Sequence, residues 1–186
     1  MLVLIGICLC QMMLFAQNKV SEEIEISFKN WDHLHQSGDY QMAAEQAQKA
    51  FEFAERSSDK MLMANALYKE GLSLLKITKR LNRHRKLAKA QLEKALFYLA
   101  SIDDPTLKVN ILEQLLWIAK KEKDNEQAAI YQNQIIEIKA LVEASKKNEQ
   151  LIEKKSNLEN RVTDLAVQKK ALTERVKSLS EAQLES

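Results

Sequence analysis

Leucine recurs at every seventh position near the end of the chain, at Leu151, Leu158, Leu165, Leu172 and Leu179. That interval brings all of these side chains to one face of a helix, because a heptad fills about two helical turns. No glycine or proline occurs from residue 125 to residue 186. The sequence therefore predicts a long helix that begins near residue 125, with a coiled coil over residues 141–186.

The heptad register also indicates how many helices associate. With the leucines at position d, the a positions hold Lys155, Val162, Lys169 and Val176. Lysine at a lowers the stability of a coiled coil and favours few strands, so we expect a homodimer. The predicted dimer seam contains Leu151, Leu158, Val162, Leu165, Leu172, Val176 and Leu179. The alternative is one amphipathic helix that folds back on the rest of the chain.

Composition extends the helical prediction to the preceding residues. The 186 residues include only 3 glycines and 1 proline, with 29% charged and 46% hydrophobic residues, which favours an all-α fold. Glycine, proline and polar clusters divide the chain into three helical pairs. We expect helices at about 20–36 and 40–56, at about 59–80 and 86–101, and at about 105–122 and from 125 onward. Ser58 or Asp59 is expected to cap one helix, and Asp104 another in front of Pro105.

Small residues mark one helix of the first pair. Ala43, Ala47, Ala50 and Ala54 follow one another at three- or four-residue spacing, with Phe51 and Phe53 beside them. Such a stripe lets two helices approach closely. The second pair has a weaker version of the pattern, in Gly71, Leu74, Ala88, Leu92 and Ala95.

This pattern resembles the second half of a tetratricopeptide repeat. The corresponding residues Ala43, Ala88 and Ala128 are 45 and 40 residues apart, whereas the standard repeat has about 34 residues. The resemblance implies a divergent array of antiparallel hairpins, an α-solenoid, over residues 20–140. A six-helix bundle with alanine-rich contacts is the alternative.

Helical-repeat arrays bind peptides or helices of other proteins in a groove. We expect the first helix of each pair to line it. The predicted groove residues are Asn30, His33, Asn65, Tyr68, Lys69, Asn110, Glu113 and Gln114.

The first sixteen residues are uncharged and largely apolar, and charge begins at Lys19. This segment, residues 1–16, is typical of a signal peptide or N-terminal hydrophobic segment, and it is shorter than the ~20 residues that span a membrane. We therefore expect an exported, periplasmic or membrane-associated protein. An uncleaved segment would give a membrane anchor, and a segment that is no signal would leave the protein cytoplasmic. Cys8 and Cys10 both lie in this segment.

A basic run occupies residues 76–89 and contains seven cations but no acidic residue. Its predicted basic patch consists of Lys79, Arg80, Arg83, Arg85 and Lys86. The run could be a solvated turn, or it could contact an acidic protein, a membrane surface or nucleic acid. Nucleic acid is the least favoured, because the run has no aromatic residue to stack on bases. The net charge of +2 gives no general preference for polyanions.

Motifs for catalysis are not found in the sequence. Histidine, cysteine and acidic residues do not occur at metal-ligand spacing, and there is neither a glycine-rich phosphate loop nor a Gly-x-Ser-x-Gly turn. We expect no catalytic residue, metal site or cofactor, and hence no enzyme.

The order of signal, array and coiled coil resembles the front part of bacterial signalling proteins, especially sensor histidine kinases with tetratricopeptide repeats. That resemblance implies an input region that senses or scaffolds while it dimerises, with any kinase domain beyond this chain. Two other functions are consistent with the same residues. One is a structural coiled-coil scaffold of the envelope, and the other is a basic adaptor for an acidic partner or nucleic acid.

Overall fold

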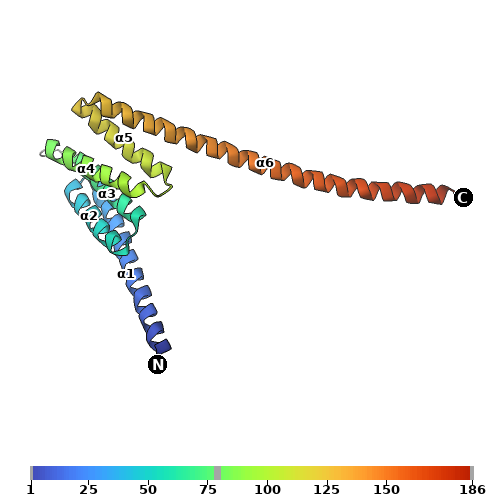
Figure 1. Cartoon of the computed structure of the whole chain (residues 1–186), viewed down its shortest axis with the longest axis horizontal. Helices are drawn as coiled ribbons and strands as arrows, with labels where there is room; N and C mark the ends of the chain where they lie inside the picture. The colour runs from blue at the N-terminus through green and yellow to red at the C-terminus, as the bar shows by residue number, and fades with distance from the viewer. Residues whose placement is uncertain (1, 78–80, 185–186) are drawn as a thin grey trace. The chain divides into compact units, whose positions relative to one another are not determined.

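The computed structural model describes residues 2–77 and 81–184, with side chains over residues 19–77 and 82–175. Every secondary-structure element within these residues is an α-helix (Figure 1), so the predicted all-α class is confirmed. The helices are α1 (Leu2–Ser37), α2 (Tyr40–Ser57), α3 (Lys60–Lys76), α4 (Leu81–Leu99), α5 (Pro105–Glu122) and α6 (Asn125–Leu184). The chain divides into two compact units, Met1–Lys139 and Ala140–Ser186, and the boundary falls inside α6.

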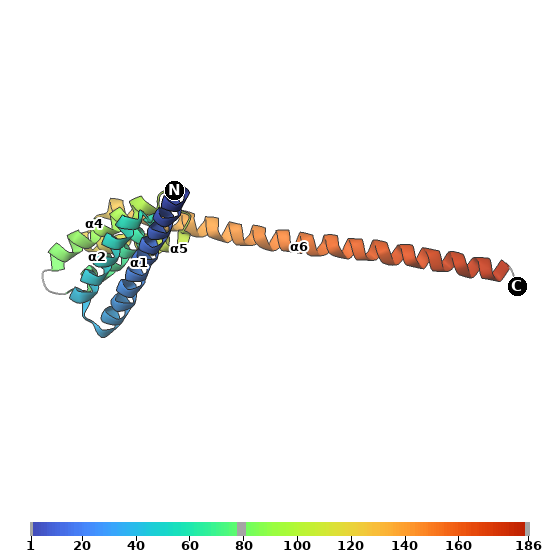
Figure 2. The same cartoon turned by 90° about the horizontal axis from the view of Figure 1, so that it is seen from below.

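The helices of the first unit pack in the order of the chain. Contacts join α1 to α2, α2 to α3, α3 to α4 and α4 to α5, and they also join the alternate helices α1 and α3, and α3 and α5. Figure 2 shows α1, α2 and α4 gathered in this unit from a second direction. This sequential arrangement is helical-repeat-like, because each hairpin packs on its neighbours along the chain.

Aspartate precedes four of the helices. The Oδ1 atoms of Asp39, Asp59, Asp104 and Asp124 each accept a hydrogen bond from the backbone N–H three residues further on, at 2.8–3.3 Å. Each bond satisfies a backbone donor that has no partner inside its helix, which stabilises a helix by about 1 kcal/mol. Of the two expected alternatives for α3, Asp59 and not Ser58 is the cap, and the expected capping aspartate in front of Pro105 is Asp104.

Three turns contain a residue with a left-handed backbone: the α1–α2 turn, the α2–α3 turn and the α5–α6 turn. Gly38 has a φ of +85°, while Ser58 has 56° and Lys123 has 59°. Glycine adopts this conformation without steric cost, whereas serine and lysine do not. Ser58 thus ends α2 and leaves the capping of α3 to Asp59.

Small residues allow the close helix packing that the sequence predicts. Ala43, Ala47, Ala50 and Ala54 have an exposed fraction of 0%. A Cβ atom added at Gly71 of α3 would lie 2.9 Å from Cγ of Leu92 in α4. Glycine is therefore required there by the approach of the two helices.

The largest core cluster joins α3, α4, α5 and the first part of α6. Its fully buried large side chains are Leu67, Leu92, Leu99, Ile111, Leu115 and Ile118. From α6, Ala128, Tyr131 and Ile135 complete this cluster. Residues 125–139 of α6 thus form the last hairpin together with α5.

The expected boundaries of the second pair are wrong. Helix α3 ends at Lys76, because Ile77 has an extended backbone (φ −72°, ψ 114°), and α4 already begins at Leu81. Residues 81–85 are helical and not the expected turn, since Leu81, Arg83 and Arg85 are good helix formers and no glycine or proline interrupts them. Residues 78–80 lie outside the described part of the chain.

The first helix is also longer than expected. It starts at Leu2 and includes the apolar N-terminal segment, whose leucine, methionine and isoleucine residues tolerate a helix. Among the described residues, no helix combines the length and the apolar character needed to cross a membrane.

Candidate interaction surfaces

An exposed apolar stripe runs along the second unit. The stripe consists of four leucines at heptad position d and one valine at heptad position a. We call these residues, Leu151, Leu158, Val162, Leu165 and Leu172, the leucine seam. Their exposed fractions are 58–65%. Fully burying one such side chain would stabilise a protein by about 1.5–3 kcal/mol. Burial of the seam against another apolar surface would therefore be favourable. The side chains of Val176 and Leu179 lie outside the described residues.

The surface of the seam has a hollow between its side chains. A shallow, mainly apolar hollow is lined by Leu165, Gln168, Lys169, Leu172 and Thr173. In a coiled coil, each a or d side chain inserts, as a knob, into a hole that four residues of the facing helix form. The residues that line the hollow occupy d, g, a, d and e positions of the heptad register, which is the arrangement that the predicted coiled coil requires of a hole.

The predicted groove residues lie on three alternate helices, as expected. Asn30 and His33 are exposed on α1, and Asn65, Tyr68 and Lys69 are half-buried on α3. On α5, Asn110 and Gln114 are half-buried, and Glu113 is exposed.

Tyr68 of α3 and Glu113 of α5 are groove residues from different helices that interact electrostatically. Burial, together with the negative charge of Glu113, raises the pKa of the Tyr68 hydroxyl. Glu113 also pairs with Lys139, at 2.9 Å between Oε1 and Nζ. The α3 and α5 sides of the predicted groove are therefore adjacent and carry polar groups.

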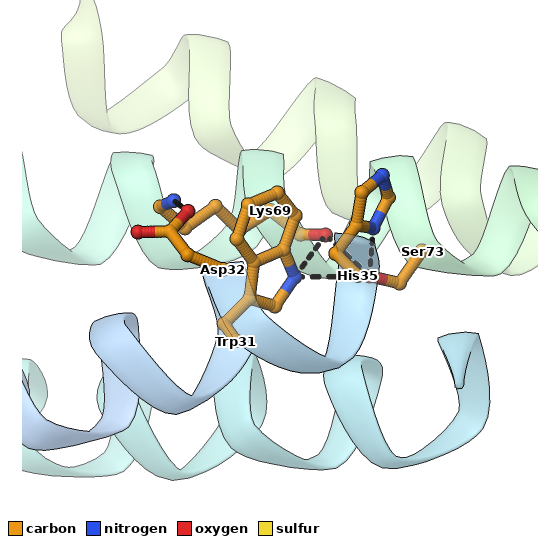
Figure 3. A network of polar contacts seen from close by, with 5 residues as sticks. All are labelled: Trp31, Asp32, His35, Lys69 and Ser73. Atoms are coloured by element: carbon orange, nitrogen blue, oxygen red, sulfur yellow. Dashed lines mark hydrogen bonds and ion pairs between the residues drawn. The ribbon is translucent and has the colours of Figure 1, made fainter. Parts of the chain in front are cut away.

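Lys69 lies between two helices, and its side chain is only 16% exposed. Its Nζ is 3.7 Å from the centroid of the Trp31 ring and 3.0 Å from Oδ1 of Asp32 (Figure 3). Trp31 Nε1 donates to the carbonyl of Lys69 at 3.1 Å and to Oγ of Ser73 at 2.9 Å. We call Trp31, Asp32, His35, Lys69 and Ser73 the α1–α3 clamp. Lys69 thus holds α1 against α3, a role that the sequence did not suggest.

His35 completes this clamp. Its ring stacks on Trp31 with 4.5 Å between centroids, and its Nδ1 lies 3.4 Å from Oγ of Ser73. Burial, reinforced by the positive charges of Lys76 and Lys69, lowers the pKa of the imidazole. The geometry therefore favours a neutral ring at this position.

The basic patch acquires an aromatic residue from another helix. Arg83 and Lys86 are exposed on α4, Arg85 is half-buried, and Lys79 and Arg80 lie outside the described residues. Trp117 of α5 is 41% exposed. Its ring lies 5.9 Å from the Arg85 guanidinium and 5.6 Å from Lys121 Nζ. We call Arg85, Trp117 and Lys121 the Trp117 surface.

The Trp117 surface could not be predicted from residues 76–89 alone, because its aromatic residue comes from α5. The available signal was a large aromatic residue on the polar side of α5, since Trp117 lies opposite the buried stripe of Ile111, Leu115 and Ile118.

Side chains suited to holding a metal ion do not gather in the described part of the chain. Glu70 of α3 is a half-buried carboxylate, and burial raises its pKa. Gln91 donates a hydrogen bond to it at 3.0 Å. This pair links α3 to α4, which is a structural role.

Comparison with known proteins gave no match, whether to a protein-family model, to a curated protein or to a solved structure.

Proposed function

We propose that this protein is a non-enzymatic module that dimerises through its leucine seam and binds a protein or peptide ligand through its helical-repeat-like unit. The observation that carries the proposal is the exposure of the leucine seam, at 58–65% along one helix face. A second copy offers the same heptad pattern and can bury the leucines of both chains. Lys155 and Lys169 at a positions favour two strands.

The module acts, in this proposal, as the sensing or scaffolding input part of a bacterial signal-transduction protein. Support comes from the order of its parts: an apolar N-terminal segment, a helical-repeat-like unit that resembles tetratricopeptide repeats, and a coiled coil. The proposed location is periplasmic or membrane-associated, which follows from the apolar segment. The proposed ligand site is a groove lined by α1, α3 and α5; its support is that α3 contacts both α1 and α5.

The test of dimerisation is the molar mass of the full chain by light scattering. The wild type is expected to have twice the mass of one chain, and Leu165→Lys with Leu172→Lys is expected to give a folded monomer. Val167→Lys is the matched control, because Val167 is 65% exposed on the same helix but lies at position f, outside the seam. A monomeric wild type, or equal effects of seam and control variants, would contradict the proposal.

A second function is favoured by the Trp117 surface: an adaptor that binds an acidic segment of a partner protein. An exposed tryptophan between two cations offers both apolar contact and charge to an acidic chain. The same helix as Arg85 also carries the exposed cations Arg83 and Lys86.

Tryptophan fluorescence tests this second function with poly-glutamate as the probe. Trp117 is 41% exposed and Trp31 only 7%, so binding at the Trp117 surface should change the emission of Trp117. Arg85→Glu is expected to weaken binding. The control is Arg56→Glu, which changes the net charge equally and removes another arginine–aromatic contact, 5.2 Å from Phe53. Equal weakening by both variants would indicate general charge attraction and reject a site at Trp117.

A further inference from the structure

The leucine seam also carries information on how two copies are oriented. We propose that the helices pair in parallel and in register, so that Asn148 meets the partner's Asn148 in a polar layer of the seam. This inference rests on the proposed dimer and specifies its geometry.

Asn148 lies three residues before Leu151 in the sequence. Because Leu151 is at position d, Asn148 is at position a of the same heptad register. It is exposed on the helical surface, like the leucines that follow it. In a parallel dimer, each a residue faces its counterpart, so two asparagine amides can hydrogen-bond to each other. In an antiparallel dimer, an a residue faces a d residue, and the amide would meet an apolar side chain. A buried amide without a partner is costly, so Asn148 favours the parallel pairing.

The g positions point to the same orientation. They include Lys147, Lys154 and Arg161, all exposed on this helix. A parallel arrangement sets g residues opposite e residues of the partner, here Ile152, Glu159 and Ala166. Those contacts are attractive for Lys154 and uncharged for the other two. An antiparallel arrangement about residue 160 would set g residues opposite g residues, so that Arg161 would face its counterpart in the second copy, where like charges repel, and Lys154 would face the uncharged Gln168.

The lysines at a argue weakly in the opposite direction, because a parallel dimer brings Lys155 near the partner's Lys155. In the described helix, however, Lys155 Nζ lies 3.7 Å from Oε1 of Glu159, which is at position e. The ammonium group therefore turns toward the edge of the seam and can remain in water on its long stem. Asn148 has no such stem, so its amide determines the preferred orientation.

Parallel pairing has a consequence for binding. The Ala140 ends of both helices meet at the same end of the coiled coil. Two helical-repeat-like units are then tethered close together, and a partner with two matching segments gains affinity through the high effective concentration.

Distances between spin labels on the full-length protein test the orientation. Cys8→Ser and Cys10→Ser remove the native thiols, and Lys146→Cys or Glu174→Cys then supplies one label at an exposed f position. Parallel pairing predicts the same distance at both positions, about the width of two helices. Antiparallel pairing about residue 160 would separate each pair of labels by about 42 Å along the axis, since the two positions are 28 residues apart. Long distances at either position would overturn the proposal.

Asn148→Leu tests the role of the polar layer. It is expected to broaden the distance distributions or raise the molar mass, because the layer that fixes register and strand number is lost. Asn160→Leu is the matched control: it makes the same replacement at an exposed f position and should leave the distances unchanged. Unchanged distances and mass in Asn148→Leu would reject the assignment of orientation to Asn148. The molar mass from light scattering distinguishes failure of the proposed dimer from failure of its proposed geometry. A monomeric wild type would contradict association through the seam, whereas a trimer would contradict only the two-stranded arrangement.

Discussion

The two units of this protein use the same long helix in different ways. Residues 125–139 of α6 bury Ala128, Tyr131 and Ile135 in the core shared with α5. Further along, Leu151, Leu158 and Leu165 stay at least 58% exposed. The first unit thus obtains its stability from its own chain, whereas the second, in the proposed dimer, would obtain it from association. Its order should therefore increase with protein concentration, and that of the first unit should not.

Leu92→Ala should cause the largest effect and break only the first unit. Leu92 is 0% exposed between α3 and α4, so its truncation is expected to cost about 2–5 kcal/mol in the free energy of unfolding. Both tryptophans of the chain lie in the first unit. Thermal unfolding followed by tryptophan fluorescence should therefore shift strongly, while the association measured by light scattering is retained.

Leu87→Ala supplies the control for this experiment, because Leu87 is on the same helix but 45% exposed. Its effect should be much smaller. If Leu92→Ala abolished association at temperatures where the tryptophan signal is still native, the energetic separation of the two units would be wrong.

An intermediate effect is expected from pH, and it should also be confined to the first unit. Burial, and then Lys76 and Lys69, lower the pKa of His35, while Asp32 opposes them. The unfolded state then binds more protons than the folded state between the lowered pKa and the usual value of about 6.5. The free energy of unfolding should consequently fall as the pH decreases through this window.

His35→Gln should reduce this pH dependence in denaturant titrations followed by tryptophan fluorescence. His33→Gln removes an exposed histidine of the same helix and should retain it. The second unit contains no histidine, so the molar mass should not change over this range. A slope that survives in His35→Gln would assign the effect to another group.

The smallest effect is a gain in stability. Lys123 joins α5 to α6 with a left-handed φ of 59°, where glycine is favoured. Lys123→Gly should raise the free energy of unfolding of the first unit by about 0.5–1 kcal/mol, because the steric cost of the left-handed backbone is removed. Gly38→Ala provides the opposite test at φ +85° and should destabilise the unit. Destabilisation by Lys123→Gly would show that its lost side-chain contacts exceed the steric gain.

Local patterns predicted the fold best where the relevant residues are neighbours in sequence. The buried alanines of α2, the caps at Asp59 and Asp104, and the long uninterrupted helix α6 depend on spacing within one helix, and the structure has them as expected. The start of α4 was missed because charge density suggested a turn, although arginine and lysine are also good helix formers.

Contacts between helices could not be predicted in the same way. The α1–α3 clamp depends on Lys69 reaching Trp31, 38 residues away, and the Trp117 surface depends on Arg85 meeting α5. Such contacts follow from helix rotation and crossing geometry, which a single sequence does not specify. The candidate groove residues lie on α1, α3 and α5, the first helix of each predicted pair, whereas the contact of Lys69 with Trp31 and Asp32 could be recognised only from the structure.

The alanines of α2 also affect how this hairpin can evolve. Alanine has no rotamer freedom to lose on burial, so Ala43, Ala47, Ala50 and Ala54 are packed with almost no loss of side-chain entropy. Since these positions are already completely enclosed, nearly every replacement adds atoms and only glycine removes them. Sequence change in this hairpin should therefore be tolerated on its outer face, and the alanine face should remain restricted to the smallest side chains.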